Sequence, residues 1–139
     1  MLISFEEFSK NREQCIEMVN KFPNLISKRE TKGGFTGDYL TWLHVWKWVR
    51  RNYNWIGFEV VEVRVSEAYA GYVIGRIFDI ESGKNLGQLG LNLESFKRVD
   101  FKTKETTYVN ETVEQLQMRV FVKLIANYTG FGIHLWEKR

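Results

Sequence analysis

Two small groups of residues have types and spacings that catalysis can use. Glu30-Thr31-Lys32 has the Glu-x-Lys spacing of metal-dependent nucleases, in which carboxylates hold Mg²⁺ and the lysine contacts the scissile phosphate. The tripeptide lies in a glycine-rich stretch, with no acidic residue on an expected neighbouring strand, so a nuclease is the weakest of the interpretations. His44 and His134 are far apart in sequence and lack the partner spacing of a zinc site. The sequence therefore predicts no catalytic site, no metal and no cofactor.

Aromatic and basic residues are concentrated between residues 39 and 55. The tryptophans of this segment are Trp42, Trp46, Trp48 and Trp55, and its basic residues are Lys47, Arg50 and Arg51. Aromatic rings stack on unpaired bases for about 1–3 kcal/mol each and arginine contacts phosphates, so this composition suits a single-strand binder. Large aromatic residues at helical spacing also suit a core, and we interpret Trp42, Trp46 and Trp55 in that way. We expect Trp48 to be exposed and to contact nucleic acid.

Two further basic groups follow. The first lies in a polar segment and consists of Lys97, Arg98, Lys102 and Lys104. The second is Arg119 and Lys123, which are one turn apart on an expected helix and therefore share a face. Like charges at this spacing repel by a few tenths of a kcal/mol, and a shared anionic partner would relieve that cost. Two long side chains extending into water explain the same pattern.

Composition is that of one folded domain. The 139 residues are 44% hydrophobic, which is enough apolar side chain for a single core. A net charge of +3 permits contact with phosphates without establishing it. The lone Cys15, interpreted as a core thiol, excludes an internal disulfide and indicates a reducing compartment. Glu6 and Glu7 stand where a signal peptide is basic, and no apolar stretch is long enough for a bilayer, so we expect a cytoplasmic protein without a membrane segment.

Cap residues and apolar spacing predict the helices. Ser4 and Glu7 form a capping box for a first helix that ends at Pro23. A loop is expected over 28–38, and then a helix over 39–53 with Asp38 as its N-cap. A last helix runs from a Thr112/Gln115 capping box to residue 128 and ends at the glycines that follow.

Alternation of apolar and polar residues predicts three strands, around 61–65, 72–80 and 89–93. A polar loop over 95–110 and a short closing strand over 133–136 complete the chain. Strands that are grouped, and do not alternate with helices, indicate an antiparallel sheet. We therefore predict a single α+β domain over 1–139, with an antiparallel β-meander of three or more strands and helices packed on one face.

Two segments carry a resemblance to a known family. Tyr39-Leu40-Thr41-Trp42 opens a helix, and Gln117 to Ala126 has the pattern Arg-x-x-x-Lys-x-x-Ala before Gly130-Phe131-Gly132 and an apolar end. In these features the chain resembles phage single-strand DNA annealing proteins, in the superfamily of the eukaryotic annealing recombinases. The resemblance covers residues 39–136, which form the annealing-protein-like core, and leaves 1–38 as an N-terminal helix and loop.

The resemblance implies a function and a site. It implies a viral protein that binds and anneals single-stranded DNA in homologous recombination, without ATP or cofactor, as a ring or filament. Arg119 and Lys123 would hold the phosphate backbone in a basic groove. The supporting contacts would be Arg50, Arg51, Lys97, Arg98, Lys102 and Trp48. The alternative is a non-catalytic α+β module that binds a protein or small ligand.

Overall fold

The computed structural model describes residues 3–30, 36–66, 70–99 and 102–137. Its elements, in chain order, are α1 (Phe5–Lys21), the 3₁₀ turn η1 (Pro23–Leu25), β1 (Ile26–Glu30), β2 (Thr36–Leu40), α2 (Trp42–Asn52), β3 (Ile56–Val65), β4 (Gly71–Asp79), β5 (Asn85–Asn92), β6 (Ser95–Val99), β7 (Thr106–Asn110), α3 (Val113–Thr129) and α4 (Ile133–Glu137).

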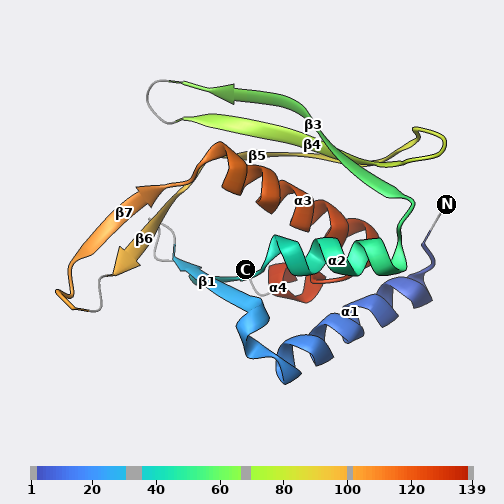
Figure 1. Cartoon of the computed structure of the whole chain (residues 1–139), viewed down its shortest axis with the longest axis horizontal. Coiled ribbons are helices and arrows are strands. Elements are labelled where there is room, and N and C mark those ends of the chain that lie inside the picture. Colours follow the sequence, from blue (N-terminus) through green and yellow to red (C-terminus); the bar gives the residue numbers. More distant parts are fainter. Residues whose placement is uncertain (1–2, 31–35, 67–69, 100–101, 138–139) are drawn as a thin grey trace.

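The predicted α+β architecture is confirmed. Strands β3, β4 and β5 form an antiparallel meander in that order, and β1–β2 and β6–β7 are separate antiparallel hairpins. All four helices lie on one side of the meander, and the β6–β7 hairpin extends away from them (Figure 1). No helix in the described ranges has both the length and the apolar character needed to cross a bilayer.

Helix α3 is the centre of the molecule. It lies between the sheet and the other helices, so its buried residues occupy most of its circumference (Figure 1). The sheet approaches this helix closely at Gly75, where a Cβ atom would come within 2.8 Å of the side chains of Phe58 and Val120. The core that α3 organises includes residues from each helix and from the meander.

A buried polar contact joins three of the helices. Asn11 on α1 donates hydrogen bonds to the Tyr53 hydroxyl, 2.7 Å away, and to the carbonyl oxygen of Thr129, 2.9 Å away. The Tyr53 hydroxyl donates in turn to Glu7. Buried polar atoms need such partners, so these bonds fix the position of α1 against the ends of α2 and α3.

The predicted helix ends are largely confirmed. The Ser4 side chain accepts from the Glu7 N–H at the start of α1, and Thr112 and Gln115 form the reciprocal capping box of α3. Gly130 ends α3 in the left-handed conformation, with φ +91°. The N-cap of α2 is wrong: Thr41 holds that position, because Asp38 belongs to β2.

Two predicted loops and one predicted strand are wrong. The expected loop over 28–38 contains parts of β1 and β2, and the expected loop over 95–110 contains β6 and β7. Both are two-stranded antiparallel hairpins of mixed polar and apolar composition. Residues 133–136, expected as a strand, belong to α4, which packs its Leu135 into the core.

The meander strand β3 differs from the predicted half-buried strand. Its first residues are buried, but Val61, Val63 and Val65 are 50%, 42% and 49% exposed. A bulge between Val60 and Glu62 shifts the register, and the closed end of the β3–β4 hairpin projects past the first turn of α3 (Figure 1). The valines therefore alternate correctly for a strand but have no helix to cover them.

Candidate nucleic-acid interface

The buried side of α2 contains Trp48, contrary to the prediction. Trp48 is 5% exposed and stacks on Phe131, with ring centroids 4.1 Å apart and an interplanar angle of 14°. Its Nε1 donates to Gln14 on α1 at 3.2 Å. Val45 and Val49 share this side, so one helix face with three core residues fixes the orientation of α2. Trp48 is therefore a packing residue and cannot stack on a base.

The opposite side of α2 exposes the tryptophans that were expected in the core. Trp42 is 41% exposed and Trp46 is 37% exposed, so for these two the core interpretation is wrong. Trp55 is half-buried, packs against the core and makes edge-to-face contacts with Tyr53 and Tyr128, as a packing residue should.

Trp42 and Trp46 form one wall of an open groove. The opposing wall consists of Phe58 from β3 and of Met118 and Phe121 from α3, and the volume between them is about 240 Å³. Phe121 meets the Trp46 ring edge-on, with centroids 5.8 Å apart, and stacks on Phe58 at 5.2 Å. The groove is therefore a shaped aromatic surface, held by side chains from three elements.

Helix α2 also carries three cations, one of which contacts a ring of the groove. The Arg50 guanidinium lies 4.6 Å from the centre of the Trp46 ring and donates to the carbonyl oxygen of Ile56. Lys47 and Arg51 are exposed on the same helix. The sequence of α2 contains no acidic residue, so no ion pair within the helix neutralises these three cations. Of the predicted contacts, Arg50 thus lies against an exposed aromatic ring, and Arg51 is exposed on the same helix.

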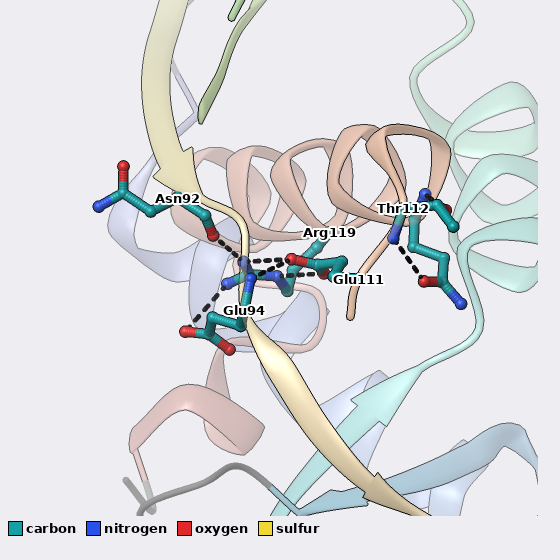
Figure 2. Close-up of polar contacts among 6 residues, drawn as sticks. Asn92, Glu94, Glu111, Thr112 and Arg119 are labelled. Carbon is teal, nitrogen blue, oxygen red and sulfur yellow. Dashed lines mark hydrogen bonds and ion pairs between the residues drawn. The ribbon is translucent and has the colours of Figure 1, made fainter. Parts of the chain in front are cut away.

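Arg119 occupies a different environment from the predicted basic groove. Its side chain is 7% exposed, and its Nε and Nη2 atoms donate to the two carboxylate oxygens of Glu111 at 3.0 and 2.9 Å (Figure 2). Nη2 also donates to the carbonyl oxygen of Asn92 at 2.7 Å, and Nη1 lies 3.8 Å from Glu94. The prediction that Arg119 holds the phosphate backbone is wrong, because its side chain is buried and its donors are bonded to acceptors within the protein.

The Arg119 contacts lock the base of the β6–β7 hairpin to α3. Glu111 immediately follows β7, and Glu94 immediately precedes β6. The backbone N–H of Glu111 donates to the Glu94 carbonyl, and the Glu94 N–H donates to the Glu111 carboxylate. One bidentate ion pair therefore fixes the point where both hairpin strands leave the core (Figure 2).

Lys123 and Arg119 do not form a shared site for a phosphate. It is half-buried, and its Nζ lies 4.8 Å from the centre of the Trp136 ring. The predicted repulsion between Arg119 and Lys123 is offset, because the Glu111 carboxylate neutralises the charge of Arg119. The contact with Trp136 directs the Lys123 side chain toward α4.

The remaining predicted residues that the structure describes belong to the β6–β7 hairpin and the β1–β2 hairpin. Lys97 and Arg98 are in β6, in register with Tyr108 and Thr107, and Lys102 is exposed in the turn after β6. Glu30 is the last residue of β1, and Thr31 and Lys32 fall outside the described residues. Within the described ranges, no group of histidine, cysteine or acidic side chains has the geometry to hold a metal ion.

Sequence reasoning missed the aromatic groove, although α2 carries a signal for it. Trp42, Trp46 and Arg50 recur every four residues, which places two rings and a guanidinium along one side of a helix. The pattern does not state which side of the helix faces the core. Phe58, Met118 and Phe121 come from distant segments, so only the fold could reveal them.

No protein-family model, curated protein or solved structure matches this chain. Residue chemistry and geometry are therefore what indicate a function.

Proposed function

We propose that this protein binds single-stranded DNA and promotes the pairing of complementary strands. It does so without ATP, as an oligomer, in homologous recombination, in keeping with the phage annealing proteins that its sequence resembles. Its place of action is the cytoplasm, that of the host cell if the protein is viral. Phosphate contacts and base stacking supply the binding energy, and the released energy of base pairing drives the annealing.

The observation that carries this proposal is the exposed face of α2. Arg50 lies against the Trp46 ring, and Lys47 and Arg51 are exposed on the same helix, which also exposes Trp42 and has no acidic residue. Proteins that hold single strands combine a cationic track for the backbone with aromatic faces for the bases. Both components are present here within three turns of one helix.

Self-association has its own support in the meander. Strand β3 is an edge strand of the sheet within the described residues, and it exposes Val60, Val61, Val63 and Val65. An edge strand with exposed apolar side chains offers both backbone hydrogen-bonding groups and apolar area to another chain. We take this edge as a contact between copies in the oligomer.

An annealing assay tests the proposed function directly. Two complementary oligonucleotides, one with a fluorophore and one with a quencher, are mixed at low salt with and without the protein, in the absence of nucleotide triphosphates. The proposal expects faster quenching with the protein, and a slower reaction with Lys47→Gln/Arg51→Gln. The same rate with and without protein contradicts it.

A second candidate function is a module for an apolar protein segment or small ligand. The groove favours it, because its lining is almost entirely apolar and ligand sites in proteins share that character. The two candidates differ in their dependence on charge. Replacement of Lys47 and Arg51 by glutamine weakens a nucleic-acid binder and leaves an apolar binding site unchanged.

A further inference from the structure

We infer that the groove between α2 and α3 receives one unpaired nucleobase of the bound strand, stacked against Trp46. This inference rests on the proposed function, and it assigns the site where a base leaves the strand. Trp42, Phe58, Met118 and Phe121 complete the site.

The size of the groove suits a single ring system. Its volume of about 240 Å³ is smaller than the roughly 300 Å³ at which sites for drug-sized ligands begin. Trp46 lines the groove with 37% of its surface exposed, and Phe121 on the opposing wall makes an edge-to-face contact with it. A flat ring system fits a site of this size.

The positive charge of α2 indicates that the bound ring belongs to an anionic chain. Arg50 contacts the Trp46 ring, and Lys47 and Arg51 are exposed on the same helix. An uncharged ring on an anionic chain satisfies both the apolar lining and these cations. The exposed acid Glu114 lies one turn before Met118 on α3, so the backbone is expected to leave the groove toward the C-terminal end of α2.

Insertion of a base into the groove also makes the site selective for single strands over duplexes. In a duplex both faces of each base are covered by its neighbours, so a paired base must leave the stack before it can contact Trp46. A single strand offers its bases at much lower cost. The groove therefore favours single strands, whereas the cations of α2 contact either form.

The test compares two strands of equal length and charge. Labelled oligothymidylate and an abasic strand with the same phosphate backbone are titrated with the full-length protein by fluorescence anisotropy. We expect the wild-type protein to prefer the base-bearing strand, and Trp46→Leu to reduce that preference by roughly 5- to 150-fold. Trp46→Phe keeps a ring face and should retain most of the preference. Phe5→Ala, which alters an aromatic residue 86% exposed on α1, is the matched control.

Each other result has a distinct meaning. Equal binding of both strands by the wild-type protein overturns the base site and leaves the proposed function standing. Binding of neither strand overturns both. If Trp46→Leu changes the mass of the oligomer but leaves the strand preference intact, the groove is a contact between protein chains and the inference is wrong. Circular dichroism of each variant reports whether it is folded.

Discussion

Arg119 donates hydrogen bonds from Nε and Nη2 to the two carboxylate oxygens of Glu111, and the Glu111 side chain has no exposed surface. Arg119 is the residue in which the resemblance to annealing proteins would place a phosphate contact. In this chain the same guanidinium holds the start of α3 to the base of the β6–β7 hairpin.

Removing Arg119 should destabilise the protein. Arg119→Ala leaves the buried Glu111 carboxylate without its counter-charge, and breaking a buried pair in this way costs about 3–5 kcal/mol. Urea denaturation followed by circular dichroism measures the loss of unfolding free energy. Arg119→Met combined with Glu111→Leu removes both charges and should recover most of the lost stability. A fully stable Arg119→Ala variant that has lost DNA binding would contradict this role.

Gly130 should not tolerate a side chain. Its φ of +91° is unfavourable for other residues, and a Cβ atom there would lie 2.3 Å from the carbonyl oxygen of Phe8. Gly130→Ala must move α1 away from the end of α3, so we expect a loss of more than about 1 kcal/mol. Gly83→Ala is the control, because its φ is also positive but nothing lies within 4 Å of the added atom. Equal losses in the two variants would show that backbone strain alone is responsible.

Stability should fall at alkaline pH because of Cys15. Burial raises the pKa of the Cys15 thiol from the ordinary 9.0 to about 12. Between these values the unfolded chain releases the proton and the folded chain retains it, so stability is intact below pH 9 and declines as pH rises toward 12. The slope is about 1.4 kcal/mol per pH unit for one group.

The control for this dependence is Cys15→Ala. Burial also raises the pKa of Tyr53 to about 12, so part of the alkaline decline remains in the variant. Denaturant titrations from pH 8 to 11 should give a shallower decline for Cys15→Ala than for the wild-type protein. Parallel declines would mean that the thiol does not contribute.

The exposed edge of β3 should control self-association. Val63→Lys places a charge on the edge strand, where it opposes pairing with another chain. Size-exclusion chromatography with light scattering should show a smaller mean mass than for the wild-type protein. Ile80→Lys changes another exposed apolar residue, 52% exposed beyond the end of β4, and should leave the mass unchanged. An unchanged mass with Val63→Lys would assign the oligomer contact to another surface.

Features set by local chemistry could be predicted from the sequence. The Thr112/Gln115 capping box, the glycine that ends α3 and the alternating residues of the meander act within a few positions, and each of them appears in the structure. The two hairpins could not be predicted, because their strands carry no continuous apolar face. Which segments pair as strands depends on where the chain folds back on itself, and the whole fold determines that.

The candidate site was harder to predict than the fold. Trp46 and Trp48 are two positions apart, so they must lie on different sides of α2, and the sequence does not say which side meets α3. Phe131 decides the question by stacking on Trp48 from a distant segment. Glu111 lies before the N-cap of α3, so the helical spacing that suggested a free Arg119 did not reveal its partner.

The salt dependence of single-strand binding tests the central claim most directly. Anisotropy titrations of the wild-type protein with oligothymidylate at several salt concentrations should give an affinity that falls as salt rises, with a slope of about 0.7 per phosphate contact. Lys47→Gln/Arg51→Gln should weaken binding and lower that slope by about 1.4. Lys10→Gln/Lys84→Gln changes net charge equally at exposed positions outside α2 and should have little effect. No binding by the wild-type protein at low salt, or binding that ignores salt, would contradict the account.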